Sequence, residues 1–183
     1  MKRLTYIVPL YFTKDSNALS DLLDLYSTYS SSITSNVDFI FIDDCSPLPV
    51  LIPSDCNLNI RLYRINEDIR WNQPGARNLG AVFAKTDYIL MTDLDHRVSE
   101  KTFEYLLKKN FWKNRVYLFR RKDHNGIKVR SHPNTFVISR STFFGCYGYD
   151  EEFCGNYGYD DEFFLKWLLL NGVSVKKYRL EIA

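Results

Sequence analysis

Apolar runs and amphipathic segments alternate along the first half of this chain. Short, nearly continuous apolar runs predict buried strands, and an apolar residue at every third or fourth position predicts a helix. The expected strands are residues 4–8, 37–42, 60–65 and 88–92. The expected helices are residues 18–29, 74–84 and 99–109. Strands that alternate with helices indicate an α/β fold with a mostly parallel sheet flanked by helices.

The pattern changes after residue 115, where the expected strands become shorter. Residues 116–121, 127–130 and 135–139 predict three short strands. Residues 160–170 predict a strong helix, which Asn-Gly at 171–172 ends. Since no linker, repeat or low-complexity tract separates the two halves, we expect a single domain over residues 1–183 with one shared core.

Composition narrows the class of protein and the partners. The chain is 45% hydrophobic, which indicates a globular protein, and its net charge of +2 is too small to indicate nucleic acid as a partner. The four cysteines lack C-x-x-C spacing and predict neither a zinc site nor a disulfide framework. Pro9 interrupts the first apolar run, and no stretch approaches the roughly 20 apolar residues of a transmembrane segment. We therefore expect a cytoplasmic protein.

Two acidic motifs follow expected strands, at the edge where parallel sheets bind ligands. Asp93 and Asp95 stand two positions apart, so in an extended segment both carboxylates project to one side and could bind Mg²⁺ or Mn²⁺. The alternative is that they are ordinary turn residues. Asp43 and Asp44 end the second strand and could accept hydrogen bonds from a uracil N–H or a ribose hydroxyl. The alternative there is an Asp-Ser-Pro turn.

A third motif opens the helix at residue 74. Residues 72–80 read Asn-Gln-Pro-Gly-Ala-Arg-Asn-Leu-Gly, which lacks the spacing of a dinucleotide fingerprint. The small residues would let the helix approach the sheet closely. Arg77 could reach a base or a diphosphate.

Two similar units near the carboxyl end combine glycine, tyrosine and acids. Residues 148–153 read Gly-Tyr-Asp-Glu-Glu-Phe, and residues 155–163 read Gly-Asn-Tyr-Gly-Tyr-Asp-Asp-Glu-Phe. Adjacent carboxylates repel one another unless a cation, a polar partner or solvent stabilises them. Aromatic faces beside hydrogen-bond acceptors suit a sugar, which has apolar C–H faces and hydroxyl edges. The alternative is an acidic helix N-terminus.

In this order, the motifs resemble those of GT-A fold glycosyltransferases, especially family 2 and the related carboxyl-terminal segment of galactosyltransferases. The resemblance covers nearly the whole chain, and rests on residues 7–9, 42–46, 74–80, 93–95 and 135–163. It implies a Rossmann-like GT-A sheet with a small mixed region on the acceptor side. Residues 1–98 would then bind the nucleotide sugar, and residues 99–183 would bind the acceptor and hold the catalytic group.

The resemblance also implies a reaction and a role for each site residue. A sugar would pass from a UDP-sugar to the hydroxyl of an acceptor, such as a glycan, with inversion and with Mn²⁺ or Mg²⁺ as cofactor. Asp161 occupies the position of the family's catalytic base. The remaining positions are Pro9, Asp43, Asp44, Arg77 and Asp93 for the donor, Asp93 and Asp95 for the metal, and Tyr157, Tyr159 and Asp160 for the acceptor.

Two departures from the family pattern bear on these roles. The usual Glu-Asp pair is Asp160-Asp161 here, which shortens the reach toward the acceptor. No histidine follows His132, so the third metal ligand stays open among His96, His124, His132 and water. Two other functions remain as alternatives: a sugar-nucleotide nucleotidyltransferase, and a carbohydrate-binding relative without catalysis.

Overall fold

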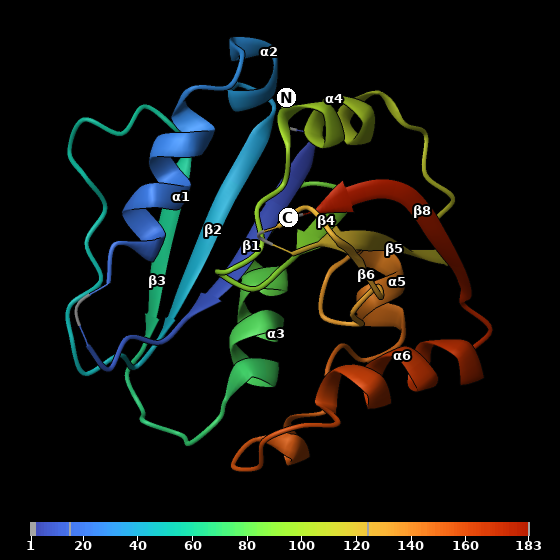
Figure 1. Ribbon diagram of the computed structural model, residues 1–183. Coiled ribbons are helices and arrows are strands. Elements are labelled where there is room, and N and C mark those ends of the chain that lie inside the picture. The colour runs from blue at the N-terminus through green and yellow to red at the C-terminus, as the bar shows by residue number, and fades with distance from the viewer. Residues whose placement is uncertain (1–2, 15, 124, 183) are drawn as a thin grey trace.

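The computed structural model describes residues 3–14, 16–123 and 125–182. Within these residues, eight strands form one sheet, and helices lie against both of its faces (Figure 1). The strand order is β3-β2-β1-β4-β7-β5-β6, with β8 paired to β5. This arrangement confirms the α/β fold with a mostly parallel sheet and a smaller mixed region.

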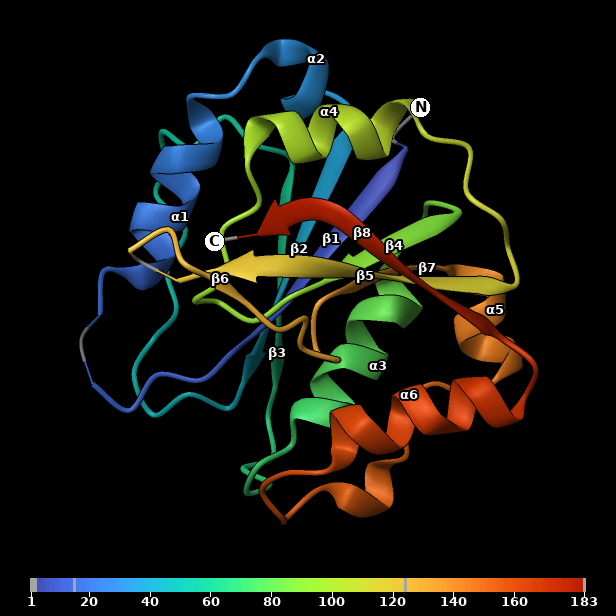
Figure 2. The same cartoon turned by 45° about the vertical axis from the view of Figure 1, so that its right-hand side comes forward.

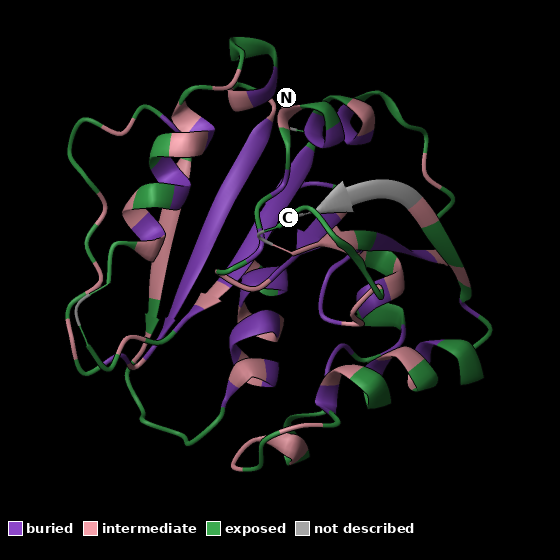
Figure 3. Ribbon diagram, in the orientation of Figure 1, coloured by how far each residue is buried: buried purple, intermediate pink, exposed green. Residues whose placement is uncertain are grey.

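The first four strands are parallel and lie in the order β3-β2-β1-β4. Their bounds are Leu4–Leu10 for β1, Val37–Asp44 for β2, Ile60–Ile65 for β3 and Tyr88–Met91 for β4. Every residue of β2 is buried (Figure 3). A central parallel strand is covered on both faces, which explains why these segments read as continuous apolar runs.

The other strands form the mixed part of the sheet. Their bounds are Arg115–Lys122 for β5, Lys128–Val129 for β6, Phe136–Ser139 for β7 and Ser174–Ile182 for β8. Strand β7 is antiparallel to both β4 and β5, whereas β8 is parallel to β5. Strand β8 was not among the expected strands, although its sequence at 178–182, Tyr-Arg-Leu-Glu-Ile, alternates apolar and polar residues as a strand does.

The helices divide between the two faces of the sheet (Figure 2). One apolar cluster joins the sheet to α1 and α4, and a second joins it to α3, α5 and α6. The longer helices are α1 (Ala18–Ser27), α3 (Gln73–Phe83), α4 (Glu100–Lys108) and α6 (Asp160–Leu170). The shorter ones are α2 (Ser31–Thr34), α5 (Arg140–Gly145) and the 3₁₀ helix η1 (Glu151–Phe153).

Helix α3 lies unusually close to the sheet, and this closeness positions the site. A Cβ atom on Gly80 would lie 2.4 Å from Cγ2 of Ile7 in β1. Any larger residue at position 80 would therefore push the helix away from the strand. The close approach carries Arg77, which precedes Gly80 by one helical turn, into the interior beside the strand ends.

Candidate active site

The sheet brings the predicted acidic motifs to one edge. Strand β2 ends in Asp44, and Asp93 lies two positions after Met91, the last residue of β4. Because β1, β2 and β4 are parallel, their carboxyl ends meet at the same edge. Helix α6 begins at Asp160 on the face that α3 covers, and so brings the third acidic motif to this edge.

Arg77 connects the donor-side and acceptor-side motifs. Its Nη2 donates to Oδ1 of Asp93 over 2.6 Å, and its Nη1 donates to Oδ1 of Asp161 over 2.7 Å. Nη1 also donates to the hydroxyl of Tyr149 over 2.6 Å, and that hydroxyl donates to Oδ1 of Asp161 over 2.9 Å. One guanidinium therefore fixes the spacing between the two carboxylates.

The protonation states support this network. Burial by itself would lower the pKa of Arg77, but its contacts with Tyr149, Asp161 and Asp93 raise the pKa above the usual range, so the guanidinium stays charged. Burial raises the pKa of Tyr149 well above the ordinary tyrosine value, so its phenol keeps the proton that it donates. Arg77 has no exposed surface. Its guanidinium is therefore engaged with Asp93, Asp161 and Tyr149 in the interior, and the contact with a diphosphate stays a prediction.

The two acids of the Asp93-x-Asp95 motif have different surroundings. Oδ1 of Asp93 accepts from Arg77 and, over 2.8 Å, from Nε2 of Gln73, and Oδ2 accepts from the amide of Asn134. The side chain of Asp95, in contrast, is 83% exposed. Asp95 is thus the motif's accessible carboxylate, while Asp93 is held by the protein.

A group of ligand atoms that could hold a cation consists of Asp93, Asp95 and His96, with all three atoms within 4.8 Å of one another. His96 is buried, which lowers its pKa, and its Nδ1 lies 2.6 Å from the hydroxyl of Thr135. Its Nε2 lies 3.1 Å from Nη1 of Arg121. Since Arg121 can only donate, Nε2 must accept, so this neutral imidazole has both nitrogens engaged.

Of the other two histidines considered as ligands, His132 accepts a bond from the backbone N–H of Asn134 over 3.3 Å. His124 lies outside the described residues. Carboxylate oxygens suit Mg²⁺ and Mn²⁺, so the accessible Asp95 fits such an ion, with few further protein ligands at hand.

Asp43 and Asp44 also differ in availability. Asp43 accepts from the backbone N–H of Ser46 over 2.8 Å and from Nη1 of Arg64, so both of its oxygens are engaged in the turn after β2. This turn corresponds to the Asp-Ser-Pro turn that was expected as the alternative to a binding role for Asp43. Asp44 accepts from Nδ2 of Asn72 over 2.8 Å, and burial raises its pKa.

A cavity of about 500 Å³ opens beside Asp44. The ends of β1 and β2 form one wall, including Pro9 and Asp44, and the segment before α3 forms the other. This second wall includes Trp71 and Gln73. Gln73 also donates to Asp93, so the cavity adjoins the second acidic motif.

The acceptor-side residues lie around the start of α6. The side chains of Tyr157 and Tyr159 are 80% and 77% exposed. Tyr157 meets Trp71 edge-to-face, with ring centroids 4.4 Å apart, so this loop lies against the wall of the cavity. Asp160 is buried, and burial together with repulsion from Asp161 raises its pKa. Its Oδ2 has no hydrogen-bond partner among the described residues.

A family model of glycosyl transferase family 2 matches residues 7–170. The chain belongs to this family. The matched range contains all the predicted site residues. No curated protein sequence is significantly similar to the chain.

Solved glycosyltransferases share the fold at low sequence identity. S. aureus TarS 1-349 in complex with UDP-GlcNAc has a TM-score of 0.69 at 14% identity, over 97% of this chain and 59% of that one. The mannosyltransferase PcManGT from Pyrobaculum calidifontis, in complex with GDP-Man and Mn²⁺, has a TM-score of 0.72 at 15% identity, over 98% and 56%. The catalytic domain of Drosophila β1,4-galactosyltransferase 7, in complex with xylobiose, has a TM-score of 0.60 at 15% identity, over 97% and 65%.

This family 2 chain thus spans less than two thirds of the length of these structures. Helices that combine the length and apolar character needed to cross a bilayer do not occur in the described residues.

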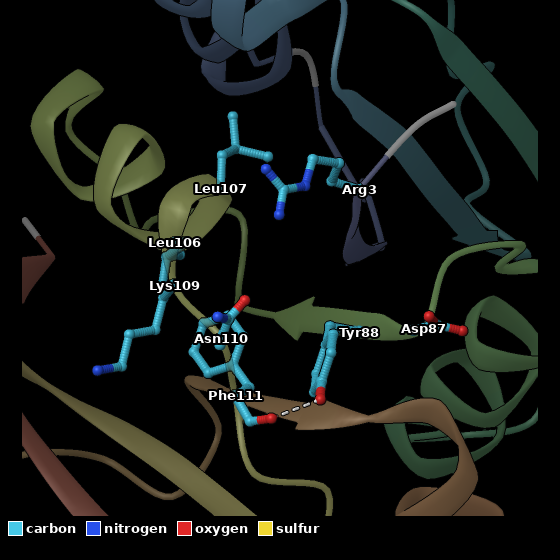
Figure 4. A pocket seen from close by; sticks show the side chains of 8 residues that line it. All are labelled: Arg3, Asp87, Tyr88, Leu106, Leu107, Lys109, Asn110 and Phe111. Carbon is cyan, nitrogen blue, oxygen red and sulfur yellow. Dashed lines mark hydrogen bonds between the residues drawn. The ribbon is translucent and has the colours of Figure 1, made fainter.

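A separate cavity of about 300 Å³ lies at the opposite edge of the sheet (Figure 4). Tyr88, the first residue of β4, lines it and donates to the carbonyl of Phe111 over 2.8 Å. Arg3, Asp87 and Lys109 also line it, and Figure 4 shows that their charged groups do not converge. The cavity is not part of the acidic site, because that site lies at the carboxyl ends of the strands.

Sequence reasoning did not identify several residues that hold the site together. Asn72 and Gln73, which bind Asp44 and Asp93, belong to a motif that was noted only for its small residues and Arg77. Tyr149 belongs to the first of the two Gly-Tyr-acid units. The repetition of this unit was the sequence signal that could have identified Tyr149 as a site residue. Asn134 stands just before a predicted strand, and the sequence contained no signal for its contact with Asp93.

Proposed function

We propose that this chain transfers a hexosyl or N-acetylhexosaminyl group from a UDP-sugar to the hydroxyl of a glycan, with inversion. The observation that carries the proposal is the bridge from Asp93 through Arg77 to Asp161, next to the 500 Å³ cavity. It places a candidate base at a fixed spacing from a candidate donor site. Membership of glycosyl transferase family 2 supports sugar transfer as the reaction class.

The donor's nucleoside occupies the cavity beside Pro9 and Asp44 in this proposal. The carboxylate of Asp44 lines that cavity and can accept from the uracil N–H. TarS complexes with UDP-GlcNAc and with UDP support uridine by analogy. Asp43 supports the turn that orients Asp44, and Arg77 positions Asp93 and Asp161.

Asp95 would be the main protein ligand of Mn²⁺ or Mg²⁺, with Asp93 beside it. When bound there, the cation would neutralise the charge that develops on the leaving diphosphate. The Mn²⁺ complex of PcManGT supports a metal at such a site. Asp93 is held by Arg77, Gln73 and Asn134. In this proposal it lies next to the donor's ribose or sugar.

Asp161 acts as the general base. The acceptor oxygen bonds to the anomeric carbon as the bond from that carbon to the diphosphate breaks, and Asp161 takes the acceptor's proton. Arg77 and Tyr149 both donate to Oδ1, so we assign the proton to Oδ2. The side chain is 13% exposed, which leaves an approach for the hydroxyl. Attack from the face opposite the diphosphate inverts the configuration.

The acceptor is held by Tyr157, Tyr159 and Asp160 in this proposal. Both tyrosines are exposed and could stack on a sugar ring, and Tyr157 lies against Trp71 in the cavity wall. The unpartnered Oδ2 of Asp160 is the polar atom that a sugar hydroxyl would satisfy.

Each of the two alternative functions predicts a feature that separates it from sugar transfer. A nucleotidyltransferase needs a glycine-rich phosphate loop with basic residues after β1, and residues 10–13 read Leu-Tyr-Phe-Thr. A carbohydrate-binding relative would release no nucleoside diphosphate.

A screen of nucleotide sugars tests the proposal. We expect hydrolysis or transfer with a UDP-sugar, stimulated by Mn²⁺, and tightest calorimetric binding for UDP among the nucleoside diphosphates. Tighter binding of guanosine or thymidine diphosphate would overturn the assignment of uridine. No release of UDP from any UDP-sugar, with or without metal and acceptor, would favour the binding relative.

A further inference from the structure

A third cavity, of about 460 Å³, lies between α6 and the segment around residues 147–151. We call it the α6 cavity. Its lining includes the aromatic rings of Tyr147, Phe163 and Trp167 and the carboxylates of Asp150 and Glu151. The donor cavity shares none of these residues.

Two aromatic side chains of α6, Phe163 and Trp167, stack against each other in this cavity. The rings of Phe163 and Trp167 are nearly parallel, at 11°, with centroids 6.2 Å apart. Nε1 of Trp167 donates to the carbonyl of Cys146 over 2.9 Å, which fixes the orientation of the indole. The next helical face is different, since Phe164 and Leu168 are buried in the core. Trp167 also packs partly against this core, whereas Phe163 is 37% exposed and meets the ring of Phe153, with centroids 5.0 Å apart.

Tyr147 has an unfavourable backbone conformation and an exposed side chain. Its φ of 68° lies in the left-handed region, which disfavours a bulky side chain, and its side chain is 83% exposed. Burial of the ring therefore does not offset the backbone strain. The left-handed backbone belongs to the end of α5, where the N–H of Gly148 donates to the carbonyl of Phe143, so it is the exposure of the ring that leaves Tyr147 available to a ligand.

The polar rim of the α6 cavity is acidic. Nδ2 of Asn78 donates to Oε1 of Glu151 over 2.7 Å and to the carbonyl of Tyr149 over 2.9 Å, which orients the rim. Asp150 and Glu151 are exposed at the rim and have oxygens that accept hydrogen bonds from hydroxyl groups. Their charge repels phosphate and other anions. Flat aromatic faces with an acidic rim therefore fit a neutral saccharide.

One residue links this cavity to the candidate base. Tyr149 lines the α6 cavity, while its hydroxyl donates to Oδ1 of Asp161. The two sites thus lie on either side of one buried ring. We propose that the α6 cavity binds a neutral oligosaccharide segment of the acceptor, beyond the sugar that reacts. The link to the acceptor rests on the proposed function, whereas saccharide binding in the cavity does not.

Direct binding without a donor tests the inference. Neutral di- to hexasaccharides of the chito-, cello-, malto- and manno- series are titrated calorimetrically into the whole chain. We expect at least one series to bind more tightly as its length increases. Tyr147→Ala and Phe163→Ala should each weaken binding about 3- to 10-fold, as the loss of one aromatic contact predicts. Leu170→Ala is the matched control, because it removes an 81% exposed apolar side chain from the same helix.

Three outcomes would overturn the inference. The first is that no series binds, and the second is that Leu170→Ala weakens binding as much as Tyr147→Ala. The third is a wild-type dimer, seen in sedimentation, that Tyr147→Ala and Phe163→Ala dissociate, since a second copy would then fill the cavity. Release of UDP from UDP-sugars is measured in parallel. Saccharide binding without UDP release would contradict the proposed function alone, and UDP release without saccharide binding would contradict this inference alone.

Discussion

Nη1 of Arg77 lies 2.7 Å from Oδ1 of Asp161, although 84 residues separate them in the sequence. The arginine has no exposed surface, so this ion pair forms in the interior next to the candidate base. A buried charge is tolerated only when it is paired, so the loss of either partner would destabilise the fold, and the pair also orients the carboxylate.

The first prediction concerns this bridge. Arg77→Lys should keep the charge but lose simultaneous contact with Asp93 and Asp161, because an ammonium lacks the planar fork of a guanidinium. We expect a loss of about 3 kcal/mol in the free energy of unfolding and a fall in transfer that exceeds the fall in folded protein. Arg61→Lys is the control, since the pair of Arg61 with Asp38 is partly exposed and should lose under about 1 kcal/mol. Equal losses in both variants, measured by denaturant unfolding, would contradict the special position of Arg77.

The second prediction concerns the candidate base. Asp161→Asn preserves the size of the side chain but removes the proton acceptor, so transfer should fall by roughly two orders of magnitude or more. Donor affinity should stay nearly unchanged, because the donor cavity lies elsewhere. Glu162→Gln is the control, since this neighbouring acid is exposed and should have little effect. Steady-state kinetics and UDP titration measure both quantities, and normal transfer by Asp161→Asn would show that the residue is structural.

The third prediction concerns the metal. Asp95→Asn should abolish stimulation by Mn²⁺ and weaken metal-dependent donor binding, because Asp95 is the accessible carboxylate of its motif. Thermal unfolding should not change, since the side chain is 83% exposed. Asp24→Asn, at another exposed position, serves as the control. Unchanged Mn²⁺ stimulation in Asp95→Asn would exclude this metal site.

The fourth prediction concerns pH and the donor. Burial raises the pKa of Asp44, so it protonates at a higher pH than an exposed aspartate does. If its ionised form accepts from uracil, UDP binding should be full above that pKa and weaken as the pH falls through it. Asp44→Asn has no such titration, so subtracting its profile removes the protonation of the diphosphate itself. Parallel profiles for the two proteins would contradict a role for Asp44.

The fifth prediction concerns Asp160. Burial, followed by repulsion from Asp161, raises its folded-state pKa above the unfolded value of about 3.9. The ionised group therefore destabilises the fold at neutral pH, and this penalty disappears as the pH falls through the folded-state pKa. Asp160→Asn should stabilise the chain by about 1 kcal/mol at pH 7, with a smaller gain in acid, and should raise the acceptor KM. A loss of stability at pH 7 would contradict this account.

The sequence predicted the parallel half of the sheet and the edge where the acids meet. Local patterns are sufficient for this, since continuous apolar runs form buried strands and each acidic motif directly follows such a run. The run at residues 37–42 became β2, and Asp44 lies at its end as expected. The helix after residue 73 was also predicted, since Pro74 suits a first helical turn. Its small residues predicted the close approach to the sheet that Gly80 makes at Ile7.

Only the tertiary structure decided which acid of each pair is available. Asp43 is used by Arg64 in the turn, and Asp93 by Arg77, Gln73 and Asn134, whereas Asp95 is exposed. The tertiary structure likewise decided that Arg77 is buried between two carboxylates. The physical reason is the same in each case. The hydrogen-bond partners come from segments far apart in the sequence, and spacing along the chain carries no signal for contacts that exist only after the sheet and its helices have packed.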